Sequence, residues 1–430
     1  MVEPVFVRLN KFCRRLKLTF WGAVLLVVLC ACGCSFFCGN SCEAREQHLE
    51  LWTIALKPKF TAYMEDLLLQ FEGGHPGVKV DWIDLPQQNI MQKLMASIAG
   101  GVPPDLVNLT TSNALFLAQS GSLVDVSQYI TTEQAGEYYP NLWRAAAWQG
   151  QVYAVPWYVS TRVLIYNKEL LNKAGWPVDK PPRSREEAAA LAAQVKRNVP
   201  GSWGFYPVVR LLDDWGMENM PVYDNSSKKF LFTQSNYVEK LEWYVRLYQQ
   251  GLLPPEFLMD GYRGALERYK QGSLALLEAG PQVLLQIKAD APHVYAQTWA
   301  APLSWSSEGR VPAALMNLAV PRSSRHRALA CELALFITSW SNQLAFAKEV
   351  PLLPSTWRST RDPFFTQRHG DPLQCEALNI SLRQLPKAND YSLSLPGARQ
   401  LERKLNLAVE AAVYGQKSSA EALTDAVPNP

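Results

Sequence analysis

Residue types that serve in catalysis are present, but the spacings that organise them into known sites are not. The sequence has five histidines, and no two of them stand four positions apart. It contains no G-x-S-x-G elbow, no phosphate-binding loop, no G-x-G-x-x-G fingerprint and no H-E-x-x-H zinc motif. Asp213-Asp214, just before Trp215, is the most suggestive pair of carboxylates, although a solvated loop is the simpler interpretation. We therefore expect no catalytic residues, no metal site and no cofactor.

Cysteines form the densest cluster of reactive side chains. Six of the eight lie in the first 42 residues without a histidine among them, which disfavours a metal site. The segment Leu29-Cys30-Ala31-Cys32 has the pattern of a bacterial lipobox, which predicts lipidation of Cys32, with Cys34 as the alternative. Five basic side chains precede an apolar run of about 14 residues, which is typical of an export signal and shorter than a membrane span. A single-pass anchor is the alternative interpretation.

The N-terminal pattern predicts where the protein resides. We expect residues 1–31 to be a lipoprotein signal peptide and residues 32–47 a lipidated tether. Two acyl chains hold a protein stably on a membrane, so we expect an exported, lipid-anchored protein on the periplasmic or cell-surface face. Beyond this segment only Cys331 and Cys375 remain. They can form a disulfide in an oxidising compartment, or Cys331 can be a buried thiol that packs as a small apolar side chain.

Charge and aromatic content narrow the class of ligand. Of the 42 basic and 39 acidic residues, five and one lie in residues 1–31, so the remaining chain has a formal charge of −1. This balance argues against nucleic acid as a partner. The chain has 14 tryptophans, and Trp157-Tyr158 follows Pro156, which suggests a strand break there. Aromatic faces beside hydroxyl and amide groups are typical of pockets for polar small molecules such as sugars.

Apolar periodicity predicts the elements that position these residues. We expect strands at 48–54, 78–85 and 106–109, alternating with helices at 59–72, 90–99 and 114–119. This order is typical of a parallel sheet covered on both faces. Ser184 with Glu187, and Ser418 with Glu421, predict capping boxes at two helix starts. Further strands are expected at 274–277 and 314–320, and further helices at 236–250, 327–339 and 399–414.

A set of motifs occurs in a characteristic order between residues 48 and 427. They include LELWTIA, FEGGHPGVKVDWIDLP, QKLMASIAGGVPPDLVNL, VYAVPWYVSTRVLIYNKELLNKAGWP, YKQGSLALLEAGPQVL, ALMNLAVPRSSRHR and YGQKSSAEALTDA. The set resembles the bacterial extracellular solute-binding proteins of the carbohydrate class, the lipoprotein receptors of ABC importers. The resemblance implies a type II periplasmic-binding fold of class α/β, with two α/β lobes around a ligand cleft. Hinge crossovers are expected near 157–162 and 312–318, with lobe 1 at 48–157 and 313–355 and lobe 2 at 158–312 and 356–430.

The resemblance also implies a function and its partners. A monomer is expected to capture a sugar (a mono-, di- or oligosaccharide, or a glycosyl polyol) and to present it to an ABC permease, without enzymatic activity. A secreted carbohydrate-active enzyme and a receptor that reports to a membrane sensor are the alternatives.

Residues for sugar binding follow from the same motifs. The nominated residues are Thr110, Ser112, Asn113, Trp157, Tyr158, Ser160, Gly280, Gln282, Asn317 and Arg399. Ser160 stands where many relatives carry Asp, Gln282 where many carry Trp, and Asn317 where Gly-Gly is common. These departures leave the identity of the sugar open.

Overall fold

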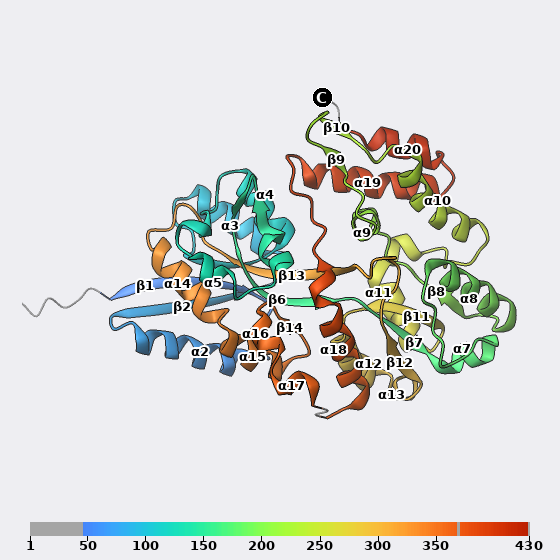
Figure 1. Cartoon of the computed structure of the whole chain (residues 1–430), viewed down its shortest axis with the longest axis horizontal. Helices are drawn as coiled ribbons and strands as arrows, with labels where there is room; N and C mark the ends of the chain where they lie inside the picture. Colours follow the sequence, from blue (N-terminus) through green and yellow to red (C-terminus); the bar gives the residue numbers. More distant parts are fainter. Residues whose placement is uncertain (1–45, 368–369, 429–430) are drawn as a thin grey trace, which may run out of the picture. The chain divides into compact units, whose positions relative to one another are not determined.

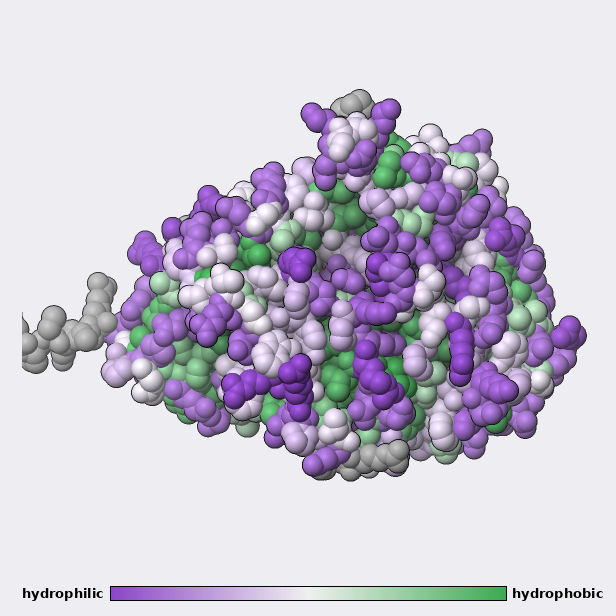
Figure 2. All heavy atoms as spheres, viewed as in Figure 1, coloured by the Kyte–Doolittle hydropathy of each residue, from purple (hydrophilic) through white to green (hydrophobic). Residues whose placement is uncertain are grey.

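The computed structural model describes residues 46–367 and 370–428. The predicted signal peptide, most of the tether, and both candidate lipidation sites, Cys32 and Cys34, lie outside the described residues. No helix in the described part is long and apolar enough to cross a membrane. The face seen in Figure 2 is largely hydrophilic, with hydrophobic patches between the polar side chains.

The chain divides into a small and a large compact unit. Within the described residues, the small unit comprises Glu46, Gln47 and Pro76–Lys79, and the N–H of Gln47 donates to the carbonyl of Gly77 at 2.8 Å. The large unit comprises His48–His75 and the chain from Val80 onward. The two sheets and the sites described below belong to the large unit, apart from the first residues of β1 and β2.

A seven-stranded sheet organises the first lobe. Its order is β14-β6-β13-β3-β1-β2, with β15 beside β13. The strands are β1 (Gln47–Ile54), β2 (Val78–Leu85), β3 (Leu106–Thr110), β6 (Val155–Thr161), β13 (Val311–Ala319), β14 (Leu353–Pro354) and β15 (Ala388–Asn389). β1 and β3 are parallel, but β13 is antiparallel to both β3 and β6. The expected parallel pairing is confirmed for β1 and β3, but the sheet as a whole is mixed, because a strand from much later in the chain inserts beside β3.

Helices cover both faces of this sheet, because successive residues of β1 from Leu51 to Ile54 are buried and point to alternate faces. Trp52 and Ile54 pack with α3 (Ile90–Ala99) and α4 (Thr111–Gln119). On α2 (Thr61–Gly74), Phe71 lies 5.4 Å from Phe336 of α14 (Arg327–Ile337), measured between ring centroids. Figure 1 shows α2 on the opposite side of the strands from α3 and α4.

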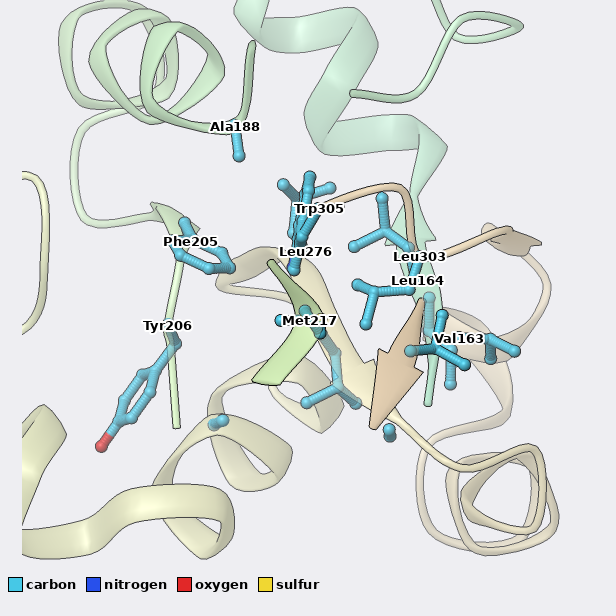
Figure 3. Packing of buried hydrophobic residues seen from close by; sticks show 14 of the residues in the cluster. Val163, Leu164, Ala188, Phe205, Tyr206, Met217, Leu276, Leu303 and Trp305 are labelled. Atoms are coloured by element: carbon cyan, nitrogen blue, oxygen red, sulfur yellow. The ribbon is translucent and has the colours of Figure 1, made fainter. Parts of the chain in front are cut away.

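A four-stranded sheet organises the second lobe, in the order β12-β7-β11-β8. Its strands are β7 (Val163–Asn167), β8 (Trp203–Phe205), β11 (Leu274–Ala279) and β12 (Thr298–Ala301). Figure 3 shows Leu164, Leu276 and Trp305 together in its core. Tyr206 directs its hydroxyl away from the other labelled side chains (Figure 3), toward Gly264, where a Cβ would lie 2.4 Å from that oxygen. A glycine on α11 (Phe257–Lys270) is thus required by this close approach.

Short connections carry the chain between the two sheets. Arg162 alone separates β6 from β7, and residues 302–310 connect β12 to β13. The helix α18 (Pro372–Gln384) packs against β6 and β14 of one sheet and β7 and β12 of the other. The structure therefore has two α/β lobes joined by crossovers.

The remaining elements are short connections or helices on the lobe surfaces. The helices are α5 (Thr132–Ala135), α6 (Pro140–Trp143), α7 (Lys168–Ala174), α8 (Arg185–Asn198), α9 (Leu211–Met217), α10 (Ser235–Gln249), α12 (Val283–Asp290), α13 (Pro292–Tyr295), α15 (Trp340–Glu349), α16 (Trp357–Thr360), α17 (Pro363–Thr366), α19 (Ala398–Val413) and α20 (Ser419–Ala426). The small strands are β4 (Ala147–Trp148), β5 (Gln151–Val152), β9 (Tyr223–Asp224) and β10 (Lys229–Phe230), and 3-10 turns lie at Val126–Gln128, Arg144–Ala146 and Leu385–Lys387.

Two local expectations need correction. Pro156 does not break a strand but lies inside β6, where the pairing register shifts: Tyr158 faces Met316, and Pro156 faces Asn317. Trp157 is the extra residue of this bulge, and a bulge tolerates a proline because a ladder hydrogen bond is already missing there. At α8 the capping box is half formed. Ser184 Oγ accepts from the Glu187 N–H at 3.2 Å, but the Glu187 carboxylate accepts from the Arg183 N–H at 2.7 Å.

The second capping box forms in full at α20. Ser418 Oγ accepts from the Glu421 N–H at 3.2 Å, and the Glu421 carboxylate accepts from the Ser418 N–H at 3.0 Å. Cys331 is buried in α14, and no disulfide joins it to Cys375. Burial raises the pKa of the Cys331 thiol to about 12, so this thiol behaves as an apolar side chain.

The acidic pair Asp213-Asp214 lies in a buried helical turn and not in a solvated loop. Both side chains are 6% exposed, in the first turn of α9. Asp213 pairs with Arg162 at 3.0 Å, and Asp214 pairs with Arg185. The neighbouring apolar side chains of α9 are buried, so the turn that carries the two acids is buried with them. The two arginines supply the countercharge that buried carboxylates require.

Candidate ligand-binding site

The loop that leaves β3 presents three polar side chains. Thr110 is extended and caps α4, since its Oγ1 accepts from the N–H of Asn113 at 3.4 Å. Its Oγ1 also lies 3.3 Å from Ser112 Oγ. All three side chains are partly exposed. The cap therefore fixes Ser112 and Asn113 in the first turn of the helix, where they remain accessible.

Arg399 reaches this loop from the other lobe. It is the second residue of α19, a helix that packs on α10 and follows Gly397, whose φ of +73° favours glycine. The Arg399 Nη2 donates to Asn113 Oδ1 at 2.6 Å, and its Cζ lies 3.8 Å from the ring centroid of Phe116. The structure thus brings together two nominated residues, Asn113 and Arg399, across 286 positions of sequence.

A cavity of about 560 Å³ opens beside this contact. Ser112 and Phe116 line it from α4, and Leu393, Pro396 and the first two turns of α19 line it from the other lobe. A neighbouring cavity of about 240 Å³ lies between Val209–Leu212 and α19, and Glu402 lines both. Burial raises the pKa of Glu402, although Arg210 and Arg399 lower it in part.

Three other nominated residues meet at a second point. Ser160 Oγ, near the end of β6, donates to Gln282 Oε1 at 3.0 Å, across 122 positions of sequence. Gly280 lies between them, and a Cβ there would be 2.3 Å from each of these two oxygens. Glycine at 280 is therefore what lets the hydroxyl and the amide approach each other. Gln282 is exposed and Ser160 is partly exposed, so both are available to a ligand.

Trp157, Tyr158 and Asn317 lie behind these surfaces. Trp157 is 0% exposed and stacks on Phe346 with ring centroids 5.6 Å apart. Asn317 is also 0% exposed and donates to Thr111 Oγ1 at 3.2 Å. Tyr158 is partly exposed, and burial raises the pKa of its hydroxyl. None of the three lines the 560 Å³ cavity.

Sequence reasoning missed two polar groups near these residues. The Asp84 carboxylate accepts from the N–H groups of Leu56 and Lys57 at 3.0 and 2.9 Å, and from the Thr53 hydroxyl at 2.6 Å. It thereby fixes the loop that leaves β1. Burial raises the pKa of Tyr262, and Arg162, in the first crossover, lowers it in part. The only sequence signal was a polar residue at a strand end, which is too common to single out either group.

Two α/β lobes joined by crossovers, with a cavity lined from both, define a periplasmic-binding fold. Residues 55–343 match the sequence model of the bacterial extracellular solute-binding proteins. The chain therefore belongs to this family, whose members are binding proteins, and an exported location follows from that membership.

Solved structures agree with the fold. One such crystal structure is of a Synechococcus sp. MITs9220 protein that is assigned as an oligosaccharide periplasmic-binding protein. Its sequence is 33% identical to this chain, and the two structures superpose with a TM-score of 0.79. That likeness covers 88% of this chain and 96% of that chain. The sugar-binding protein MalE from Xanthomonas citri is 21% identical with a TM-score of 0.73, and covers 88% and 95% of the two chains. At that lower identity the likeness shows the fold alone.

Curated relatives are more distant. A Brucella abortus protein assigned as a binding protein is 24% identical, and the match spans 54% of this chain and 57% of that protein. The chain thus matches little more than half the length of this relative. The mannitol-binding protein of Pseudomonas aeruginosa is 23% identical, and that match covers 84% of this chain and 88% of that protein.

Proposed function

We propose that the chain captures a sugar outside the cytoplasmic membrane and delivers it to the permease of an ABC importer. One observation carries the proposal: α4 of one lobe and α19 of the other line a single cavity and meet through Asn113 and Arg399. Hinge motion of two such lobes opens and closes a cavity of this kind. The relatives named for oligosaccharide and mannitol support a polyhydroxylated ligand.

The accessible side chains suit such a ligand. The amides of Asn113 and Gln282 donate and accept hydrogen bonds, as sugar hydroxyls do, and the hydroxyls of Ser112 and Ser160 do the same. Phe116 offers an aromatic face for the C–H side of a sugar ring. Thr110 and Gly280 position these groups, whereas Trp157, Tyr158 and Asn317 hold the strands behind them.

We also propose that the protein is a lipid-anchored monomer, attached through Cys32 or alternatively Cys34, that binds its ligand without turning it over. Near-neutral charge in the remaining chain is compatible with an uncharged or weakly charged ligand. Incorporation of labelled palmitate in cells, lost on Cys32→Ser but kept on Cys34→Ser, supports the anchor at Cys32, and the reverse pattern assigns it to Cys34.

Intrinsic tryptophan fluorescence of residues 43–430, titrated with mono-, di- and oligosaccharides and polyols, tests the capture of sugar. We expect at least one saturable response, weakened by Asn113→Ala and unchanged by Asn219→Ala, which alters an exposed amide elsewhere. Silence across the panel from a folded protein contradicts the proposal. Hydrolysis of a glycoside in the panel supports the enzyme alternative instead.

A further inference from the structure

Arg399 is a partly buried cation whose guanidinium forms no ion pair among the described residues. Among the described residues, no carboxylate forms an ion pair with its guanidinium within 4.0 Å. Burial lowers the pKa of Arg399, which Glu402 raises and Arg403 lowers further. A guanidinium remains protonated even so. Desolvating a charge costs free energy unless an opposite charge compensates, and Glu402 compensates this cation without forming an ion pair with it. An anion in the cavity would therefore find a cation that is not engaged in a salt bridge.

The position of Arg399 is fixed before any ligand arrives. Phe116 covers one face of the guanidinium, with 3.8 Å from Cζ to the ring centroid, and Asn113 Oδ1 accepts one N–H at 2.6 Å. A guanidinium has five N–H donors in one plane. Arg399 lines the 560 Å³ cavity, and its hydrogen bond to Asn113 uses only one of these donors. Such a planar fork matches two oxygens of a carboxylate or a sulfate.

The rest of the cavity wall is poor in negative charge. Arg403, one turn further along α19, lines the same cavity, and Glu402 is the one acid among the described residues that line it. Burial raises the pKa of that acid. Gly397 and Ala398 at the start of α19 line the cavity, so the positive end of this helix dipole lies beside it.

We infer that the cavity binds an acidic saccharide, whose carboxylate or sulfate group pairs with Arg399 while its ring packs beside Phe116. The inference rests on the proposed sugar capture and adds the chemical class of the ligand. A uronic acid and a sulfated sugar present the same pair of oxygens to the guanidinium, so the experiment separates these two sources.

The test is calorimetric titration of residues 43–430 with two matched pairs of probes. One pair is trigalacturonate and its neutral methyl ester, and the other is neocarratetraose sulfate and the desulfated tetraose. The variants are Arg399→Gln, which removes the charge, Arg399→Lys, which keeps the charge without the fork, and Arg325→Gln, an exposed arginine used as control. Thermal unfolding of each variant verifies that it is folded.

We expect an acidic probe to bind about tenfold or more tightly than its neutral partner, because a hydrogen bond to a charged group increases affinity by about this factor. Arg399→Gln should abolish this preference and Arg399→Lys should restore part of it, while Arg325→Gln leaves it intact. Rising salt should weaken the acidic probe alone. Comparing the affinities of the uronate probe and the sulfated probe identifies which anion the cavity prefers.

Equal affinity for an acidic probe and its neutral partner overturns the inference but leaves the proposed sugar capture standing. The same holds if Arg399→Gln weakens both members of a pair equally. If none of these probes binds while a neutral sugar of the fluorescence panel does, the acidic class is wrong. If no sugar of any kind binds, the proposed function fails together with the inference.

Discussion

At the residue scale, Gly280 shows what sequence could and could not reveal. Family motifs nominated Ser160, Gly280 and Gln282 separately, from segments far apart in the chain. That Gly280 leaves room for the Ser160–Gln282 hydrogen bond depends on a contact across 122 positions, which no local pattern encodes. The family motif also nominates Trp157, but the bulge in β6 turns its ring into the core.

Gly280→Ala should weaken the binding of ligand without unfolding the lobe. The new Cβ would lie 2.3 Å from both Ser160 Oγ and Gln282 Oε1, and these side-chain ends can move aside. Loss of their shared geometry should reduce sugar affinity by about tenfold, measured by calorimetric titration. Gly73→Ala is the matched control, because a Cβ there meets nothing within 4 Å. Full affinity in Gly280→Ala would remove this cluster from the binding site.

At the element scale, α9 is held in the second lobe by buried charge. Asp214 pairs with Arg185, accepts a hydrogen bond from the Tyr244 hydroxyl at 2.8 Å, and is 6% exposed, against 12% for Arg185. The sequence shows two adjacent acids but does not indicate their arginine partners. Arg162 comes from the crossover between β6 and β7, and Arg185 comes from α8. Apolar periodicity located most helices and strands because it is local, whereas partners of buried charge are set by the tertiary fold.

Asp214→Ala should destabilise the protein strongly. It leaves the Arg185 charge buried without its partner, which typically costs about 3–5 kcal/mol. Urea unfolding at neutral pH measures the free energy of unfolding. Lys173→Ala is the control, because the Lys173–Glu169 pair is 55% and 52% exposed, and exposed pairs contribute about 0–1 kcal/mol. A loss in Asp214→Ala no larger than in the control would mean that α9 does not depend on this pair.

The contact between α2 and α14 should make stability depend on pH. His75 Nε2 lies 3.0 Å from Glu332 Oε1, and its Nδ1 lies 2.8 Å from the Phe71 carbonyl oxygen. The Glu332 side chain, followed by the Phe71 carbonyl, raises the pKa of His75 above its ordinary value of 6.5. Protonated His75 therefore stabilises the folded state fully below pH 6.5, and this contribution is lost as pH rises through the folded-state pKa.

Urea unfolding of the wild type and of Glu332→Gln at several pH values tests this contact. Between about pH 6 and 8 the wild type should lose more unfolding free energy than the variant, in which the charged partner of His75 is absent. Parallel curves for the two proteins would show that the His75–Glu332 contact contributes no pH dependence.

At the scale of the whole molecule, the order of elements was predictable and the pairing of strands was not. Alternating strands and helices indicated an α/β protein, and the ordered motifs implied two lobes. The insertion of β13 beside β3 makes the first sheet mixed, and it brings Asn317 against Thr111. A cavity lined by α4 and α19 likewise depends on how the chain returns after α18. Such long-range placement decides which nominated residues reach a ligand.

We infer that the two lobes capture one sugar and release it unchanged. Native mass spectrometry of residues 43–430, after incubation with a mixture of neutral and acidic oligosaccharides, tests it most directly. We expect one sugar adduct per protein chain. After denaturation of the protein, the mass of the released sugar should equal that of an oligosaccharide supplied. Absence of any adduct from the folded protein, or recovery of cleaved saccharides, would contradict it.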